Sequence, residues 1–350
     1  MLERFYRLFS CGIGIDLGTA NTLVYLEGAG IVINEPSIVA VNEKTGRLVA
    51  VGNDAKQMVG RTPLHLSIVK PLVEGVISNF EVAEEMLAYF IRRVREMSRR
   101  RFLRPTVVIG VPSGITNVEI RAVRDAAKNA GARLVYIIEE PMAVALGIRL
   151  PIFEPVGQMI IDIGGGTTDI AVISLGGIVR SKNLKIAGER FNSDIITYVR
   201  DEFKVLLGEK TAEDTKIRIG SVIKQKEPRE ATVRGRDLVT GLPKEVILTD
   251  SDIREALTGS LEIFVDAVKE VLESTPPEVV SDIMHQGIII AGGSALMIGL
   301  DALLAQELKI RIIMADDPLT AVVRGTGIVL ENLGRYHDLL ISDKDDLPPR

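Results

Sequence analysis

The sequence lacks most of the residues from which disulfides, zinc sites and histidine-based active sites are built. Among its 350 residues there is no tryptophan, one cysteine and only three histidines. The lone Cys11 excludes an internal disulfide and argues against a structural zinc site, which needs several thiolate or imidazole ligands. Histidine catalysis therefore has little to work with.

Long apolar runs, strong basicity and the P-loop motif are also absent. No run reaches the roughly 18 apolar residues of a membrane-spanning helix, and the first residues do not resemble a secretory signal. The net charge of −5 does not favour nucleic acid as a partner. Because no Gly-x-x-x-x-Gly-Lys-Ser/Thr motif occurs, a P-loop enzyme is excluded. We expect a cytoplasmic α/β protein.

What the sequence has instead is one pattern that occurs twice. Residues 159–173 are an apolar run that ends in Asp162, a turn of three glycines and two threonines, and a second apolar run. Residues 14–26 have the same order, with Asp16 in the place of Asp162. Each copy predicts a β-hairpin with a tip of bare backbone. Such an internal repeat predicts a chain of two related halves.

The two hairpin tips indicate a phosphate site. Successive glycine N–H groups are able to surround a phosphate because no Cβ blocks the approach. A carboxylate just before the glycines would repel that phosphate unless a divalent cation lay between them. Mg²⁺ is the natural candidate, since one or two carboxylates, waters and phosphate oxygens usually hold it. A nucleotide between the two halves would be bound from both sides.

Two adjacent acids, Glu139 and Glu140, follow an expected buried strand over residues 134–138. Pro141 comes next and is expected to begin a helix. Either carboxylate would be placed to orient a water molecule for hydrolysis of a terminal phosphate, and the pattern alone does not choose between them. The structural alternative is that these acids stabilise the helix N-terminus.

Two short segments combine apolar and basic residues. Leu2, Phe5 and Phe9 share one face of a short amphipathic helix, with arginines between them. Phe102 and Leu103 lie within a cluster of arginines. Both segments suit an anionic membrane surface, and we favour peripheral attachment through both. The alternatives are packing or fraying for the first segment and burial in the core for the second.

The motifs together resemble those of the actin/sugar-kinase/heat-shock ATPase superfamily. Residues 14–22, 139–143 and 162–168 look like its phosphate-1, connect-1 and phosphate-2 motifs. Within the superfamily, residues 110–116 and 240–243 are similar in sequence to the MreB family of bacterial actins. This resemblance extends from about residue 12 to about residue 333.

The resemblance implies a duplicated actin-like, ribonuclease H-like α/β fold. Two large subdomains would each carry a small inserted subdomain, with a nucleotide cleft between the halves. The implied boundaries are 11–36, 76–156 and 318–335 for subdomain IA, 37–75 for IB, 157–189 and 247–317 for IIA, and 190–246 for IIB, with an amphipathic segment 1–10 and a polar tail 336–350.

The resemblance also implies roles for individual residues. Asp16 and Asp162 would hold hydrated Mg²⁺, and Glu140, the acid directly before proline, would polarise the attacking water. Glu213 and Lys216, on a helix expected to be capped by Thr211, would contact the ribose and base of ATP. The remaining nucleotide contacts would come from Gly18, Thr19, Ala20 and Asn21, from Gly164, Gly165, Gly166 and Thr167, and from Gly292 and Gly293.

Three motifs depart from the family pattern, at four positions. Ser294 stands where a third glycine is common, and its side chain would crowd the adenine or ribose. Glu189 and Asn192 replace two aspartates, which puts a contact by residue 192 in doubt. Asp169 stands where glutamate is usual and has one methylene less reach.

The implied function is an ATP-dependent filament protein, a Mg²⁺-dependent ATPase whose hydrolysis is coupled to polymerisation. Its partners would be further copies of itself, the inner leaflet of the plasma membrane and membrane proteins of the cell-wall elongation machinery. Organising that machinery would maintain rod shape. The protein would be cytoplasmic and peripheral at the membrane, with no nucleic acid partner.

Two other classes share the expected ATPase core. A small-molecule kinase would need an aspartate base in the cleft, and no acid is clearly set up for that role. A heat-shock-type chaperone would need an appended peptide-binding domain, for which we expect no room in 350 residues.

Overall fold

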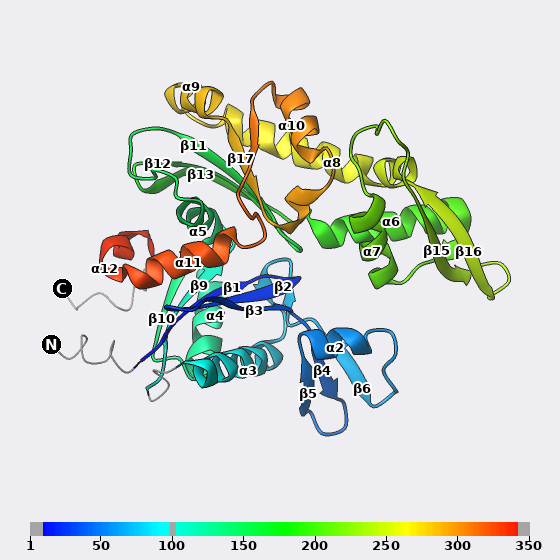
Figure 1. Cartoon of the computed structure of the whole chain (residues 1–350), viewed down its shortest axis with the longest axis horizontal. Coiled ribbons are helices and arrows are strands. Elements are labelled where there is room, and N and C mark those ends of the chain that lie inside the picture. Colours follow the sequence, from blue (N-terminus) through cyan, green and yellow to red (C-terminus); the bar gives the residue numbers. More distant parts are fainter. Residues whose placement is uncertain (1–9, 99–102, 342–350) are drawn as a thin grey trace. The chain divides into compact units, whose positions relative to one another are not determined.

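The chain forms two compact units in a computed structural model that describes residues 10–98 and 103–341. Unit 1 comprises Met1–Pro155, Ile173–Ile178 and Leu319–Arg350, and unit 2 comprises Val156–Val172 and Val179–Pro318. Each unit is built on one five-stranded sheet. The chain therefore leaves unit 1, builds unit 2 and returns (Figure 1).

The sheet of unit 1 has the order β10-β9-β1-β2-β3. Neighbours β1, β2 and β3 are antiparallel, whereas β1, β9 and β10 are parallel. The strands are β1 (Gly12–Leu17), β2 (Asn21–Leu26), β3 (Gly30–Pro36), β9 (Thr106–Val111) and β10 (Leu134–Glu139). The predicted first hairpin is confirmed, with Leu17 opposite Thr22.

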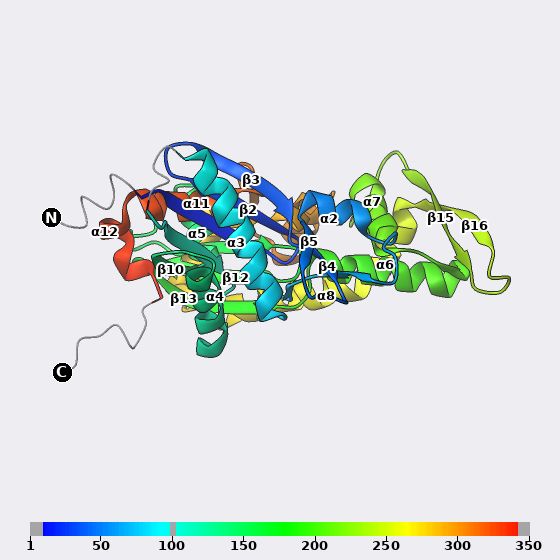
Figure 2. The same ribbon diagram turned by 90° about the horizontal axis from the view of Figure 1, so that it is seen from below.

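Helices cover both faces of this sheet. Successive side chains of a strand point to opposite faces, so apolar residues on each face pack against a different set of helices. Ile13 and Ile15 of β1 point into a core that also contains residues of α3 (Phe80–Met97) and α4 (Asn117–Asn129). These two helices lie side by side (Figures 1 and 2). Gly14, which points to the other face, lies against Thr326 of α11 (Ala321–Glu331).

The sheet of unit 2 repeats that order as β18-β17-β11-β12-β13. Each strand has a counterpart at the same place in unit 1, and the pairs β11–β17 and β17–β18 are again parallel. The strands are β11 (Gln158–Ile163), β12 (Thr168–Ser174), β13 (Gly177–Leu184), β17 (Ile288–Ala291) and β18 (Ile312–Met314). The duplication predicted from two hairpins thus extends to the whole sheet.

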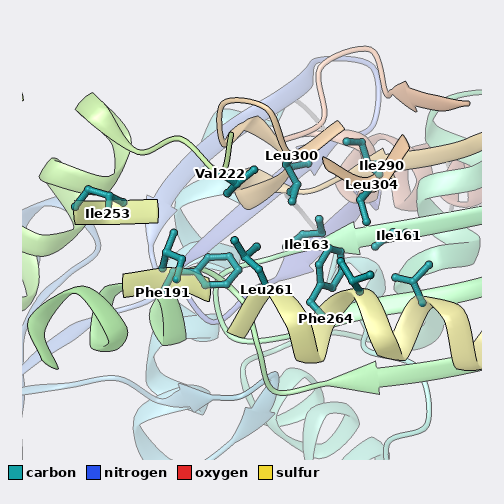
Figure 3. Packing of buried hydrophobic residues seen from close by; sticks show 14 of the residues in the cluster. Ile161, Ile163, Phe191, Val222, Ile253, Leu261, Phe264, Ile290, Leu300 and Leu304 are labelled. Atoms are coloured by element: carbon teal, nitrogen blue, oxygen red, sulfur yellow. The ribbon is translucent and has the colours of Figure 1, made fainter. Parts of the chain in front are cut away.

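The core of unit 2 lies between this sheet and long amphipathic helices. Ile161 and Ile163 of β11 pack with Phe264 of α8 (Asp250–Glu273) and with Leu304 of α10 (Leu300–Leu308), as Figure 3 shows. The other helices of the unit are α6 (Gly188–Phe203), α7 (Glu209–Ile219), α9 (Pro277–Gln286) and the 3₁₀ turn η1 (Gly293–Leu296).

Smaller elements complete each unit. Unit 1 has a three-stranded sheet, a two-stranded hairpin and three short helices: β5-β4-β6 (Leu48–Val51, Val39–Asn42, Leu66–Val69), β7-β8 (Leu72–Val73, Val76–Ile77), α2 (Asn53–Met58), α5 (Glu140–Gly147) and α12 (Leu333–Tyr336). Unit 2 has the sheet β14-β15-β16 (Val205–Leu206, Glu230–Asp237, Pro243–Thr249), whose β15 and β16 form a ribbon (Figure 2).

One expectation about local structure is wrong. Thr211 does not cap α7, because Gly208 occupies the N-cap and Thr211 lies inside the helix. At the start of the polar tail, η2 (His337–Leu339) forms a 3₁₀ turn, and Ile341 N–H donates to Ile137 O at 2.9 Å. Residues 342–350 lie outside the described part.

Candidate functional site

Two predicted carboxylates lie on either side of one glycine at the carboxyl edge of the first sheet. Gly110 of β9 pairs with Asp16 on one side and with Ile138 on the other. Glu140 begins α5 just after β10, and its Cγ is 3.6 Å from the point where a Cβ on Gly110 would lie. The parallel strands β1, β9 and β10 therefore bring Asp16 and Glu140 to the same edge.

The geometry also separates Glu140 from its neighbour Glu139. Burial raises the pKa of Glu139, and hydrogen bonds from the Ser113 side chain and the Gly114 N–H act in the opposite direction. Glu139 is the last residue of β10, whereas the Cγ of Glu140 lies beside Gly110 of β9. Burial raises the pKa of Asp16 to about 7.

α5 is held in place by backbone contact with α11. A Cβ on Gly325 would come within 1.8 Å of Ala143 O, and one on Gly147 within 2.0 Å of Ala321 O. Glycine at both positions lets the two helices approach more closely than side chains would allow. This contact fixes the start of α5 and hence Glu140.

The first hairpin turn is braced by Ser37, directly after β3. The hydroxyl of Ser37 donates to Gly18 O, and its N–H donates to Ala20 O at 3.0 Å. The Thr22 hydroxyl lies 2.8 Å from the Ser37 hydroxyl. Within the same turn, Thr19 Oγ1 accepts a bond of 2.9 Å from the Gly75 N–H. These bonds fix the carbonyls of the turn.

The second sheet repeats the edge of the first. Asp162 pairs with Ala291, as Asp16 pairs with Gly110. The next residue, Gly292, has φ +84, and a Cβ there would lie 2.3 Å from Ile163 O and 2.5 Å from the Asp162 carboxylate. Only glycine fits, so the loop after β17 lies directly against the end of β11.

Two separate elements brace the second hairpin turn. Gly164 O accepts from the Ser294 hydroxyl at 2.8 Å and from the Gly188 N–H at 3.2 Å. Gly165 O accepts from the Glu189 N–H at 2.8 Å. The N-terminus of α6 and the loop after β17 therefore both hold this turn, in which Thr167 is buried.

Lys216 joins the same cluster from α7. Its ammonium donates to Gly188 O at 2.7 Å. Burial lowers the pKa of Lys216 to about 8, while the nearby charges of Glu213 and Glu189 raise it. Unit 2 thus brings Lys216 and Glu213 to the elements that hold the second turn.

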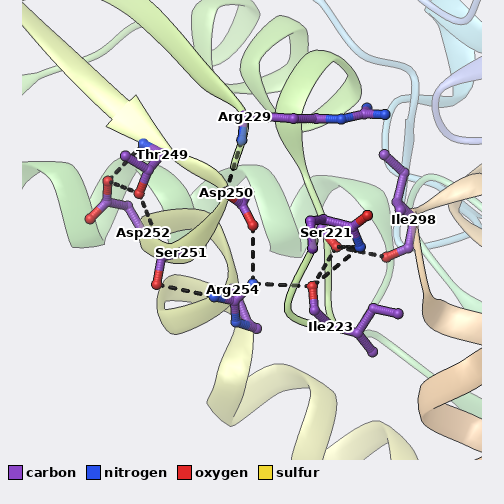
Figure 4. Close-up of polar contacts among 10 residues, drawn as sticks. Ser221, Ile223, Arg229, Thr249, Asp250, Ser251, Asp252, Arg254 and Ile298 are labelled. Atoms are coloured by element: carbon purple, nitrogen blue, oxygen red, sulfur yellow. Dashed lines mark hydrogen bonds and ion pairs between the residues drawn. The ribbon is translucent and has the colours of Figure 1, made fainter. Parts of the chain in front are cut away.

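A polar network fixes α7 to the far end of the loop that begins at Gly292. Ser221 forms a parallel bridge with Ile298, and its hydroxyl donates to Ile223 O at 2.7 Å. Arg254 of α8 donates to that same carbonyl at 3.1 Å and to Asp250 at 3.3 Å (Figure 4). The loop is therefore held at both of its ends.

With this geometry established, comparison with known proteins shows the family. The family model described as MreB/Mbl protein matches residues 10–338. The chain belongs to the MreB/Mbl family. It is 48% identical over 350 residues to the cell shape-determining protein MreB of Escherichia coli, covering 98% of this chain and 100% of that protein. It is 47% identical to Mbl of Bacillus subtilis over 328 residues, covering 94% and 98%.

A solved structure agrees with the fold. MreB5 of Spiroplasma citri bound to ADP is 42% identical and superposes with a TM-score of 0.89, covering 94% of this chain and 98% of that one. The same figures hold for that protein bound to AMPPNP. The chain therefore has the actin-like fold of the MreB/Mbl family.

The structure shows the surroundings of three residues that depart from the MreB/Mbl sequence pattern. The Ser294 hydroxyl is directed at Gly164 O. Asn192 is buried on α6, and within the described part of the chain its Oδ1 has no hydrogen-bond partner. Asp169 is buried and accepts from Asn183 with both carboxylate oxygens at 3.1 Å.

The residues expected at a membrane are mostly outside the described ranges. Leu2, Phe5, Phe9 and Phe102 fall there, and Leu103 is half-buried. Across residues 10–98 and 103–341, no helix combines the length and apolarity needed to cross a bilayer.

The sequence alone did not indicate the bracing residues. Ser37 acts through its hydroxyl and Gly188 through its backbone N–H, each on a segment distant in the chain. Ser294 was marked only as a departure from a pattern. A serine within a glycine-rich loop was the signal that the sequence offered for this residue.

Proposed function

We propose that this chain is an ATP-dependent, membrane-associated filament protein that maintains rod shape by organising the cell-wall elongation machinery. One observation carries the proposal. In a member of the MreB/Mbl family, two glycine turns follow matched aspartates at equivalent places in duplicated sheets, Asp16 opposite Gly110 and Asp162 opposite Ala291. The MreB5 structures with ADP and AMPPNP support a nucleotide as ligand.

The residues present fit a hydrated Mg²⁺ together with a nucleotide. Among the described residues no three His, Cys, Asp or Glu side chains gather to ligate a metal directly, so water and phosphate oxygens would complete the shell. Burial favours the neutral form of Asp16, and a nearby cation would favour the carboxylate. Bound Mg²⁺ would supply charge neutralisation for phosphoryl transfer.

The chain's own groups would bind the nucleotide in separate parts. The N–H groups of residues 18–21 and 164–167 would contact the phosphates. Glu213, Lys216 and the Gly292–Gly293 backbone would contact the nucleoside. Glu140, held beside Gly110 at the sheet edge, would accept a hydrogen bond from water and orient it toward the terminal phosphate. No covalent intermediate is required.

Filament formation, membrane attachment and partners complete the proposal. Copies of the chain would assemble head to tail, since a heterologous contact that does not close generates a filament. The chain would divide into subdomains IA, IB, IIA and IIB at the boundaries that the resemblance implies. Leu2, Phe5, Phe9, Phe102 and Leu103 would anchor the filament to the inner leaflet.

Co-sedimentation with anionic liposomes in the presence of ATP and Mg²⁺ tests the proposal. The intact protein is compared with a variant that lacks residues 1–9 and carries Phe102→Ser and Leu103→Ser. We expect ordered filaments on lipid for the intact protein and loss of lipid binding for the variant. Phosphate release should rise with assembly. A protein that stays monomeric, with turnover stimulated by a sugar, would instead identify a small-molecule kinase.

A further inference from the structure

The most informative feature outside the assigned contacts is the Ser294 hydroxyl. It donates to Gly164 O at 2.8 Å, and both residues lie in unit 2. Ser294 belongs to the loop after β17, whereas Gly164 begins the turn after β11. The bond therefore connects the loop expected to hold the nucleoside with the turn expected to hold phosphate.

The same arrangement occurs in unit 1. There the Ser37 hydroxyl donates to Gly18 O, and Gly18 corresponds to Gly164 in the repeated hairpin. The two serines come from different places, since Ser37 follows β3 and Ser294 follows β17. A hydroxyl thus holds the equivalent carbonyl in both halves, although the sequence repeat does not include the serine.

Holding a carbonyl also sets the direction of the next N–H. In a planar trans peptide the carbonyl oxygen and the amide hydrogen point in opposite directions. Because Ser294 and Gly188 hold Gly164 O, the N–H of Gly165 is directed away from the loop after β17 and from α6. Two flanking glycines would otherwise let this peptide rotate with little steric resistance.

We propose that Ser294 is a positioning residue that orients the Gly164–Gly165 peptide toward the phosphates of a bound nucleoside diphosphate or triphosphate. It would also keep the phosphate turn in register with the nucleoside loop. A ligand that spans both parts benefits from this register, whereas adenosine, which lacks phosphate, does not. The inference rests on the proposed nucleotide binding.

The test measures the affinity of the intact chain for ADP, AMPPNP and adenosine by calorimetry or ligand-observed NMR, with Mg²⁺ present. In Ser294→Ala we expect ADP and AMPPNP to bind about three- to tenfold more weakly, as for the loss of one hydrogen bond. Adenosine affinity should stay within about twofold, and Ser294→Thr, which keeps the hydroxyl, should restore ADP binding.

A matched control separates positioning from general destabilisation. Ser274 is also in unit 2, at the end of α8, and its hydroxyl donates to Val271 O at 3.1 Å. Ser274→Ala should leave all three affinities unchanged. Equal losses for ADP and adenosine in Ser294→Ala, or no loss for either, would overturn the role of Ser294. Wild-type protein that binds neither ADP nor AMPPNP would overturn the proposed function itself.

Discussion

The two glycine turns sit at equivalent places in duplicated sheets but are braced in different ways. In unit 1 the braces are Ser37, directly after β3, and the Gly75 N–H, which donates to Thr19. In unit 2 the braces come from Ser294 and from the N-terminus of α6. The first turn is therefore held by residues that are not themselves expected to contact a nucleotide. The second depends on the loop and helices that carry the nucleoside contacts.

The largest effect should come from Glu140, the carboxylate that follows β10 at the edge of the sheet of unit 1. Glu140→Gln should lower ATP turnover roughly 10²- to 10⁴-fold by removing the acceptor that orients water. ADP affinity should change little. Glu139→Gln is the matched control, because Glu139 is the adjacent acid at the end of β10 and its Cγ is not the one beside Gly110. Equal losses of phosphate release in the two variants would refute the assignment to Glu140.

The tight edge of unit 2 predicts the largest change in stability. Gly292→Ala should lower the free energy of unfolding by about 3 kcal/mol or more, because the residue has φ +84 and its new Cβ would clash with Ile163 O. Gly259→Ala, in α8 with open space around its Cβ, should instead stabilise by roughly 0.5–1 kcal/mol. Urea unfolding of both variants checks the pair. A Gly292→Ala protein as stable as wild type would contradict the observed packing.

The buried ammonium of Lys216 gives unit 2 a pH dependence. Its pKa is about 8 when folded and 10.5 when exposed. Between these values the unfolded chain binds more protons, so this lysine makes stability rise with pH; below about pH 8 the burial penalty is fully present. Lys216→Met should lack the rise, worth roughly 2 kcal/mol. Urea unfolding between about pH 7.5 and pH 10 measures it, and parallel curves for the two proteins would contradict it.

The smallest effect is expected from Ser37→Ala, which tests whether the two glycine turns are braced independently. Ser37→Ala leaves Gly18 O and the Thr22 hydroxyl without a buried partner, which should cost roughly 1–2 kcal/mol of stability. Its effect on ADP binding should be independent of Ser294→Ala, so that the two losses add in the double variant. Strong non-additivity would show that the turns act as one unit.

Elements with local signals could be predicted from sequence. Both hairpins and the helix that begins around Pro141 are present as expected. The prediction that Thr211 caps α7 was wrong. The helix begins after Gly208, and Thr211 lies within it, where its carbonyl accepts the Thr215 hydroxyl. The hydrogen bond between Ile341 and Ile137 could not be predicted, because no local pattern marks a tertiary contact.

The residues of the candidate site also differ in whether a local sequence signal marks them. Strand-end aspartates and the acids before Pro141 follow from apolar runs that stop at a charge. The braces at Gly18 and Gly164 depend on which distant segments the fold brings together, and hydroxyl-to-carbonyl bonds leave no periodic pattern. Sequence therefore indicated the groups that would touch a ligand better than those that aim them.

The return of the chain to unit 1 has a consequence for biosynthesis. Ribosomes extend the polypeptide from its N-terminus, so unit 2, which ends at Pro318, is fully translated before α11 exists. Until α11 is made, β1 lacks the helix that lies against Gly14, and α5 lacks its contact at Gly325. The nascent protein can thus finish its second unit while its first is still open on one face, and the last helix to be made closes the unit that was begun first.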